Sequence, residues 1–321
     1  MRYILILLLL AVCGCKSQND IESRLVNEGD YPERPVEIII PFGEGGASDI
    51  FVRDFSRLMQ KDFHYGITFA NISGQGGQYA MQKAQRSPAD GYTILEITPS
   101  IIIHDILENG GKKKLMQDFV PIAKIQSDNY IVSFSKDSQY RSFEDMMKAK
   151  KGKVVLVSGI SKGGLDSIAV SLLAESTGVD FRLVPYKSGA EAKAGIVSGE
   201  TSVYIDKVIS ALPMINKELV KPVLVLGDER LRMLKDVPCS GELGLNTPIT
   251  SWRAFMVRRE TPKYIRRYIN ESVRKVMQSE EYQMMLSGND DGITDTIYAE
   301  RFINGQYDVY KSVVKGKKFR K

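Results

Sequence analysis

Short apolar runs alternate along most of the chain with segments whose apolar residues recur every three or four positions. The runs have the length of buried strands, and the spaced segments have the period of helices that pack on one side. This alternation predicts an α/β fold with parallel sheets, in which ligands bind where the strands end. The predicted strands cover residues 36–40, 67–71, 93–98, 153–157, 181–184, 202–205 and 222–226, and the helices between them include 48–61, 78–87, 165–177 and 190–198.

The pattern changes after residue 250. A strand-like run at 252–257 is followed by almost wholly helical periodicity at 262–278, 280–287 and 298–314. Pro262 suits the first turn of its helix, where a missing backbone N–H costs nothing. Because these helices need a sheet to cover, the chain is expected to return here to the lobe with which it began.

Two segments 118 residues apart share a pattern of strand, glycine loop and helix. They begin at Val36 and Val154, and they align Gly45 with Gly163. Glycine lets backbone N–H groups approach a ligand, and the helix that follows directs its free N–H groups and its positive dipole end to the same place. Such glycines also make simple tight turns. Two of these loops in facing lobes, however, would hold the two ends of one small anion.

The first fifteen residues have the pattern of an export signal. Arg2 precedes an apolar run at 3–12 that is far shorter than the ~20 residues needed to span a bilayer. Cys15 follows a small residue, as in the bacterial lipobox, where the new N-terminal cysteine is acylated. A plain secretory signal is the alternative. Residues 16–30 are polar and irregular, as a tether from lipid to a folded body would be.

Length and composition narrow the class of protein. At 321 residues the chain exceeds a usual single core, so two lobes are expected. It has two histidines, His64 and His104, and Cys239 is the one cysteine that would remain unmodified after export. This leaves little material for a metal site, and neither a metal nor a cofactor is expected. The net charge of +5 comes from 44 basic and 39 acidic residues spread along the chain, which indicates a solvated surface and no nucleic-acid partner.

A serine hydrolase is the rival interpretation. Gly159, Ser161 and Gly163 fit the G-x-S-x-G pattern that presents a nucleophile between a strand and a helix. Such enzymes place a histidine after the nucleophile, yet no histidine follows His104. Because a serine hydroxyl without a positioned base is a poor nucleophile, catalysis by Ser161 is the weaker alternative.

Short motifs follow one another in a recognisable order from about residue 31 to 295. Tyr31-Pro32 leads into the glycine loop at 41–49, a second glycine loop lies at 71–77, and 87–93 contains a P-x-D-G-Y-T turn. Further motifs stand at 184–189, 204–206, 236–238 and 242–244, before Trp252. Together they resemble the solute receptors of tripartite tricarboxylate transporters, also called Bug proteins.

The resemblance implies a two-lobed, type II periplasmic-binding-protein fold with a ligand cleft between the lobes and no catalytic activity. Lobe 1 would comprise residues 31–128 and 250–321, and lobe 2 residues 129–249. The hinge would lie near Asn129 and Ser251, where the chain crosses. Such receptors capture a small solute, usually a carboxylate, and present it to a membrane permease.

The two repeated loops would form opposite walls of this cleft. The family also implies pocket positions at the strand end of lobe 1 and around Tyr186 and Asp206 in lobe 2. Tyr186 could instead be a core aromatic residue, and Asp206 a helix cap. The expected ligand-binding residues are Phe42, Gly43, Glu44, Gly45, Gly46, Ser48, Asp49, Thr98, Ser100, Ser158, Ser161, Lys162, Gly163, Gly164, Asp166, Tyr186, Ser188 and Asp206.

Two positions depart from the family's pattern. Ile72-Ser73 stands where an arginine and a proline usually follow the asparagine of the second glycine loop, which puts a contact there in doubt. Glu44 replaces a proline or alanine and brings a carboxylate to a carboxylate site, where like charges repel. We hypothesise that Glu44 and its repeat equivalent Lys162 pair across the closed cleft or contact opposite charges of a zwitterionic ligand such as an amino acid. Two solvated charges are the alternative.

The leading prediction is therefore an exported receptor, anchored as a monomeric lipoprotein in the periplasm or at the cell surface. It would bind a di- or tricarboxylate, an aromatic acid or an amino acid and deliver it to the permease of a tripartite transporter. A receptor that senses the same ligand without transporting it remains the alternative, since the sequence does not separate the two.

Overall fold

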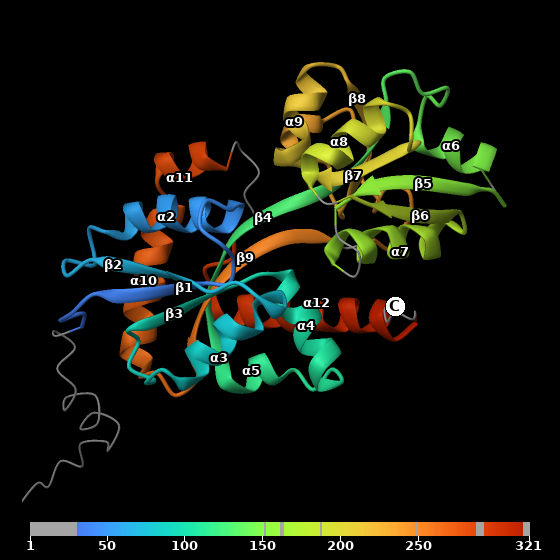
Figure 1. Cartoon of the computed structure of the whole chain (residues 1–321). Coiled ribbons are helices and arrows are strands. Elements are labelled where there is room, and N and C mark those ends of the chain that lie inside the picture. The colour runs from blue at the N-terminus through green and yellow to red at the C-terminus, as the bar shows by residue number, and fades with distance from the viewer. Residues whose placement is uncertain are drawn as a thin grey trace, which may run out of the picture.

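The computed structural model describes residues 31–150, 152–160, 164–186, 188–247, 249–286 and 292–316. These residues form two α/β lobes joined by two long strands, as Figure 1 shows. The predicted signal, the tether and Cys15 lie outside the described residues. Within the described ranges, no helix is both long and apolar enough to cross a membrane.

The first lobe is built on a mixed sheet of five strands. Their order is β2 (Ile67–Asn71), β1 (Val36–Ile40), β3 (Thr93–Ile97), β9 (Thr250–Arg258) and β4 (Phe119–Ser135). β1 is parallel to β2 and β3, whereas β9 is antiparallel to both β3 and β4. The carboxyl ends of the three parallel strands therefore meet at one edge, which faces the second lobe.

The second lobe repeats this arrangement. Its order is β6 (Asp180–Pro185), β5 (Val154–Gly159), β7 (Val203–Lys207), the far half of β4, and β8 (Val220–Leu226). β5 is parallel to β6 and β7, and β4 is antiparallel to β7 and β8. By position in the sheet, β5 corresponds to β1, and β4 has the place that β9 has in the first lobe.

β4 belongs to both sheets because its pairing changes along its length. From Phe119 to Asn129 it pairs with β9, and Asn129 lies opposite Thr250. From Tyr130 onward it pairs with β7 and β8, with Tyr130 opposite both Lys207 and Leu226. β4 and the start of β9 therefore lie where the chain passes between the lobes.

The repeat expected from the sequence is present as local structure. β1 leads through a loop to α2 (Ala47–Met59), and β5 leads to α7 (Leu165–Thr177). Both helices have 13 residues, and their first residues are as far apart in sequence as Val36 and Val154. The same pattern of apolar run, glycines and amphipathic segment has thus produced the same strand, loop and helix in each lobe.

Alternate residues of β1 face two different cores, because side chains of a strand point to opposite faces. Ile38 and Ile40 belong to a buried cluster with residues of α2 and α10 (Lys263–Met277). Ile39 belongs to another cluster, with residues of α3 (Gln78–Arg86) and α4 (Pro99–Asn109). The remaining named helices are α5 (Lys114–Asp118), α6 (Phe143–Lys150), α8 (Gly189–Val197), α9 (Val208–Asn216), α11 (Glu280–Met285) and α12 (Thr296–Gly316), with 3-10 turns η1 (Gln75–Gly77) and η2 (Arg232–Leu234).

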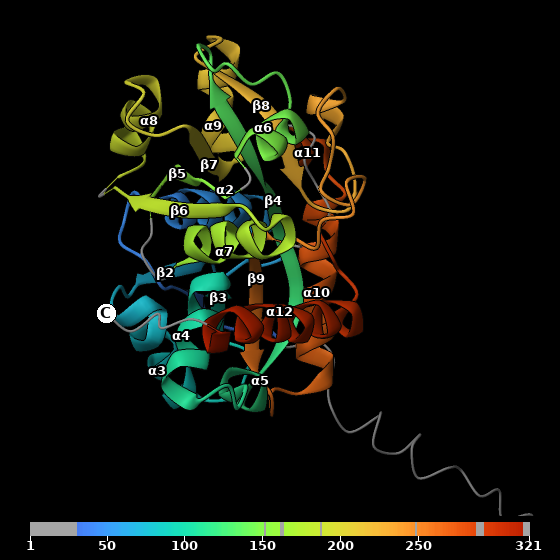
Figure 2. The ribbon, with the colours of Figure 1, turned by 90° about the vertical axis from the view of Figure 1, so that its right-hand side faces the viewer.

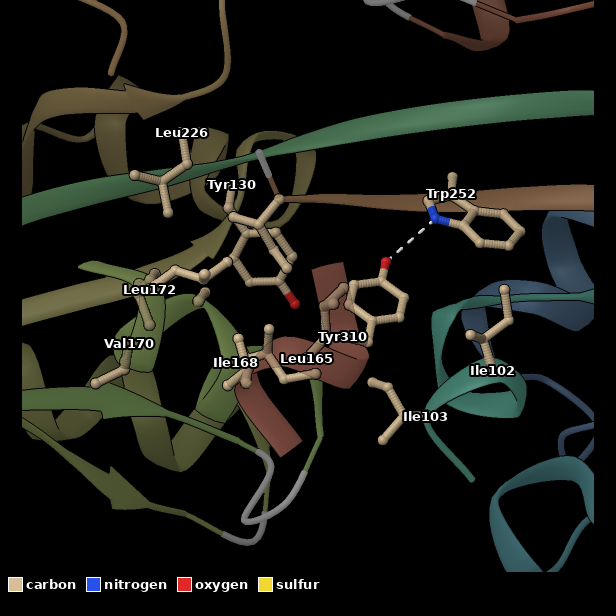
Figure 3. Close-up of a cluster of buried hydrophobic side chains, with 14 of the residues drawn as sticks. Ile102, Ile103, Tyr130, Leu165, Ile168, Val170, Leu172, Leu226, Trp252 and Tyr310 are labelled. Atoms are coloured by element: carbon tan, nitrogen blue, oxygen red, sulfur yellow. Dashed lines mark hydrogen bonds between the residues drawn. The ribbon is translucent and has the colours of Figure 1, made fainter. Parts of the chain in front are cut away.

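One buried cluster continues from the first lobe into the second. It joins Ile102 and Ile103 of α4 to Leu165 and Ile168 of α7, and Tyr310 of α12 lies among them (Figure 3). Figure 2 shows α12 running alongside α7, and α12 contacts both α4 and α7. On this face of the molecule the lobes therefore share a common apolar core.

Some expectations about the fold are wrong or incomplete. The sheets are mixed rather than parallel, because β4, β8 and β9 run antiparallel to their neighbours. The pattern also misses β4, which contains the buried polar residues Lys124 and Gln126, and α9, which contains Pro213. It misses α4, whose apolar run at 101–103 lacks helical spacing. Pro262 is the cap directly before α10 and lies outside its first turn.

Candidate functional site

The loop between β1 and α2 is a tight turn that leaves the start of the helix open. Gly45 has a φ of +72°, a conformation that favours glycine. Gly46 is the N-cap of α2, and no side chain hydrogen bonds to cap this end in the described part of the chain. Gly43, Glu44 and Gly45 are exposed. The N–H groups of the first turn are therefore suited to an anion.

Asp49, in the first turn of α2, holds this loop in place. Its carboxylate accepts hydrogen bonds from Gly45 N at 2.8 Å, from Arg53 Nε at 2.7 Å and from Asn71 Nδ2 at 3.0 Å. Asn71 also donates to the carbonyl oxygen of Phe42 at 3.1 Å. Burial opposes ionisation, but the three hydrogen bonds outweigh it and lower the pKa of Asp49. The Asp49 carboxylate is thus used to shape the loop.

Asp166 has the same role in the loop between β5 and α7, where it accepts a hydrogen bond from a backbone N–H of the loop. Its carboxylate accepts hydrogen bonds from Ile160 N and from the hydroxyl of Tyr130, each at 2.7 Å. Burial raises the pKa of Asp166, these two donors oppose the shift, and the Asp206 charge adds to it. Gly164 is the N-cap of α7, and no side chain of the described residues caps this helix start. In both lobes an aspartate of the first helical turn therefore binds an N–H of the preceding loop.

Part of the second loop cannot be compared with expectation. Ser161, Lys162 and Gly163 lie outside the described residues, so the contact of Glu44 with Lys162 and the role of Ser161 stay predictions. Ser158, just before them, is fully buried, and its hydroxyl donates to the carbonyl oxygen of Ala192 in α8. The Ser158 side chain thus joins its strand to a helix.

Tyr186 and Ser188 make contacts with α8. A Cβ placed on Gly195 would lie 2.2 Å from the Tyr186 hydroxyl oxygen, so the tyrosine ring packs directly on the helix backbone. Burial, with the neighbouring Glu200 carboxylate, raises the pKa of Tyr186 to about 12. Ser188 is the N-cap of α8 and accepts a hydrogen bond from Glu191 N at 3.2 Å. Both side chains therefore have structural contacts of their own.

Two buried carboxylates lie at the start of α9. Asp206 is the second-to-last residue of β7 and accepts hydrogen bonds from the hydroxyls of Tyr204 and Ser210, both at 2.5 Å. Asp128 of β4 accepts a hydrogen bond from Ile209 N, in the first turn of α9, at 3.4 Å. Burial raises the pKa of Asp128 to about 6, and the Asp206 charge contributes. Asp206 was expected from the sequence, whereas Asp128 was not.

The start of α4 lies near the second glycine loop, which in turn contacts Pro41 at the start of the β1–α2 loop. Thr98 precedes this helix, and its buried hydroxyl has no hydrogen-bond partner in the described ranges. Ser100 is half-buried in the first turn. Gly77, with a φ of +96°, lies so close that a Cβ there would be 2.6 Å from Ile101 and 3.1 Å from Pro41. The second glycine loop therefore packs between α4 and the end of β1.

Sequence reasoning missed a buried polar cluster beside the start of α2. Arg253 Nε is 3.2 Å from Ser48 Oγ and 3.2 Å from Glu96 Oε1, and its Nη1 donates to Gln126 Oε1. Of the expected residues that the structure describes, Ser48 is the one with a hydrogen bond to this cluster. The available sequence signal was the charge of Glu96 inside the otherwise apolar run at 93–97.

Comparison with known proteins gives the family. The model described as the tripartite tricarboxylate transporter family receptor matches residues 51–318. The chain belongs to this receptor family. Protein BugT of Bordetella pertussis is 25% identical over 277 residues, covering 84% of this receptor and 85% of BugT. A UPF0065 protein from the tcbD-tcbE intergenic region of a Pseudomonas species is 27% identical over 251 residues, covering 77% and 75%.

Solved structures are similar to this receptor in fold. A TctC solute-binding protein from Polaromonas has a TM-score of 0.79 at 21% identity, covering 89% of the receptor and 100% of that chain. MatC from Rhodopseudomonas palustris, solved with malate, has 0.68 at 20% identity, covering 88% and 100%. Another protein of that bacterium, solved with adipate, has 0.71 at 23% identity, covering 89% and 98%.

These findings confirm two predictions made from the sequence. The short motifs identified the right family, and the two-lobed α/β fold is the fold of its solved members. The family is one of transporter receptors, and its solved member from Polaromonas is described as a solute-binding protein. The general function of this receptor is therefore solute binding.

Proposed function

We propose that this receptor captures a small carboxylate between its two lobes, outside the cytoplasm. The observation that carries the proposal is the matching construction of two helix starts. Among the described residues, neither α2 nor α7 has a side-chain cap at its start, and each follows a loop held by a first-turn aspartate. Helix N-termini attract carboxylates through unpaired N–H groups and a positive dipole end. With one such start in each lobe, a ligand would be bound at both ends.

The proposed lobes are residues 31–128 with 250–321, and 129–249, with the hinge near Asn129 and Ser251. The pairing of β4 supports this division, because β4 leaves β9 after Asn129 and joins the second sheet at Tyr130. A change of twist at this point would turn one sheet relative to the other. The shared core along α12 limits such motion to the opposite face of the molecule.

The proposed ligand is a di- or tricarboxylate, an aromatic acid or an amino acid. Two proteins of similar fold were solved with malate and with adipate. Both ligands are dicarboxylates with a charge at each end, which suits two opposed helix starts. Glu44 is exposed at the tip of the first loop, where a carboxylate would favour a ligand that also carries an ammonium group. Lys162 would supply the opposite charge.

The proposed setting is that of a lipoprotein. Residues 1–15 would direct export, Cys15 would be acylated, and residues 16–30 would tether a monomeric body to the membrane. The family model names a tripartite transporter, which supports a membrane permease as the partner that receives the ligand.

A thermal-shift screen of the mature protein tests the ligand proposal. Malate, adipate, aspartate and glutamate are titrated from about 10 μM to 10 mM, because a ligand at ~100 times its Kd stabilises a protein by about 2.7 kcal/mol. At least one acid should raise the melting temperature in a concentration-dependent way. If no small acid or amino acid shifts melting, the proposal fails.

A matched pair of variants tests whether the start of α2 binds the anion. Gly46→Asp adds a favourable N-cap whose carboxylate competes with an anionic ligand, whereas Gly46→Ala adds a similar Cβ without charge. A Cβ at residue 46 would lie 3.2 Å from the Gly43 carbonyl oxygen in both variants. Gly46→Asp should therefore melt at or above the temperature of Gly46→Ala without ligand, but lose the ligand-induced shift. Gly46→Ala should retain that shift. Equal ligand responses of the two variants would place the anion elsewhere.

A further inference from the structure

The side chain of Arg253 contacts three other elements, α2, β3 and β4. It lies in β9 and is 14% exposed. Its Nε is 3.2 Å from Ser48 Oγ in the first turn of α2, and its Nη1 donates to Gln126 Oε1 in β4. Its Nε is also 3.2 Å from Glu96 Oε1 in β3, and its guanidinium carbon lies 5.3 Å from the centre of the Phe51 ring in α2.

The pair that Arg253 forms with Glu96 is buried. Glu96 is 0% exposed, and its two carboxylate oxygens accept no hydrogen bond of good geometry from the described residues. Burial raises the pKa of Glu96 to about 7, and the Arg253 charge opposes this shift. Burial likewise lowers the pKa of Arg253, while Glu96 and Asp128 oppose it. Two desolvated charges of this kind add little net stability compared with apolar residues of similar size.

Arg253 of this pair also lies on one of the strands that join the two lobes. Arg253 and Gln126 are opposite each other in the register of β9 and β4. These are the two strands at which the chain passes between the lobes. Ser48 directly precedes Asp49, the residue that fixes the β1–α2 loop. Arg253 thus links that loop to the strands that join the lobes.

We propose that Arg253 is a positioning residue that fixes the first turn of α2 to β4 and β9, so that the β1–α2 loop and the lobe-joining strands move as one body. Glu96 holds the guanidinium in the orientation that reaches Ser48. The significance of this coupling for ligand capture rests on the proposed function. The coupling itself concerns the protein without ligand.

Hydrogen exchange of the ligand-free mature protein tests the coupling, with mass spectrometry of peptides that cover residues 41–53. The variants are Arg253→Gln, Glu96→Gln and the double variant. Arg253→Gln leaves Glu96 without its counter-charge, so both the melting temperature and the protection of the loop should fall. The double variant removes both charges and should recover most of the melting temperature. Its loop amides should still exchange about tenfold faster than in the wild type.

Arg258→Gln is the matched control. Arg258 lies at the other end of β9 and donates to the carbonyl oxygens of Gln85 and Ser87, on the side away from α2. This variant should lower the melting temperature without changing exchange at 41–53. If the double variant regains both melting temperature and loop protection, or if Arg258→Gln affects the loop as much as Arg253→Gln, Arg253 has no positioning role.

A ligand found in the screen allows a second measurement. The double variant should bind it about tenfold more weakly while melting near the wild-type temperature, because the loop is no longer held in place. The single variant Arg253→Lys should keep the ion pair with Glu96 but bind the ligand nearly as weakly as the double variant. An ammonium group lacks the planar fork that reaches Ser48 and Gln126 together. Full recovery with lysine would overturn the positioning role. Failure of the ligand proposal removes this measurement but leaves the exchange experiment unaffected.

Discussion

Asp49 and Asp166 make the same local contact but ionise differently. Asp49 is close to the guanidinium of Arg53 and the amide of Asn71, which favour its charged form. Asp166 has a hydroxyl and one backbone N–H as donors, and the Asp206 charge opposes its ionisation. As pH falls, Asp166 should therefore become protonated first, and Asp49 should stay ionised to lower pH.

Replacing Asp49 by asparagine tests this anchor. The lowered folded-state pKa means that ionised Asp49 stabilises the fold above the unfolded value of 3.8, and that this contribution is lost as pH falls through the folded value. Asp49→Asn should cost ~2 kcal/mol at neutral pH, because charge-assisted hydrogen bonds are removed. The difference in the free energy of unfolding between wild type and Asp49→Asn should disappear as pH falls below 3.8. Thermal melts between about pH 7 and 3 measure it.

Asp54→Asn is the control for that experiment, since Asp54 is exposed on the same helix. It should change the melting temperature little at any pH. A gap between Asp49→Asn and wild type that stays constant with pH would show that the carboxylate charge is unimportant for the loop.

At the scale of elements, the second glycine loop fills the space between α4 and the end of β1. Gly77 combines a φ of +96° with contacts to Ile101 and Pro41 that leave no room for a Cβ. Gly77→Ala should therefore destabilise the protein by ~2–4 kcal/mol, from overpacking and from the unfavourable backbone conformation together. Denaturant unfolding measures the change.

Gly178 provides a control that separates these two causes. It ends α7 with a φ of +70°, but a Cβ there would meet nothing within 4 Å. Gly178→Ala should cost only ~1 kcal/mol, from the backbone conformation. If both variants lose the same stability, the close contacts of Gly77 are not important.

Elements with one period and clear ends could be predicted from the sequence. β1 is apolar apart from Glu37, and α7 lies between Gly164 and Gly178, so the bounds of α7 were predicted correctly. β4 could not be predicted, because Gln126 and Asp128 are buried through partners from distant segments. A strand with polar residues is not recognised from its local pattern when those residues are buried by partners far away in the sequence.

The candidate site could be predicted in outline but not in its contacts. The glycines located both loops, since their conformations are local. That the carboxylates of Asp49 and Asp166 bind loop N–H groups depends on tertiary geometry. The cluster of Arg253, Glu96 and Gln126 brings together three strands that are far apart in sequence. The charge of Glu96 in its apolar run indicates that a buried partner is needed, but a single sequence does not identify that partner.

At the scale of the whole molecule, the apolar core shared by both lobes should make unfolding one cooperative event. Ile168 of α7 is fully buried in that core. Ile168→Ala should cost ~2–5 kcal/mol, as expected for truncation of a buried isoleucine. Calorimetry should show a single transition that moves to lower temperature as a whole. Two transitions, with one of them unmoved, would mean that the lobes unfold independently.

The placement of Trp252 has a practical consequence. It is the chain's single tryptophan and is fully buried. Its indole Nε1 lies 3.3 Å from Tyr310 Oη (Figure 3) and 3.3 Å from Gln306 Oε1, both in α12. Indole emission depends on such polar neighbours. α12 also contacts α7, the helix that follows the β5–α7 loop. The protein thus contains a native fluorophore at the junction of its lobes, from which a solute could be detected without any attached dye.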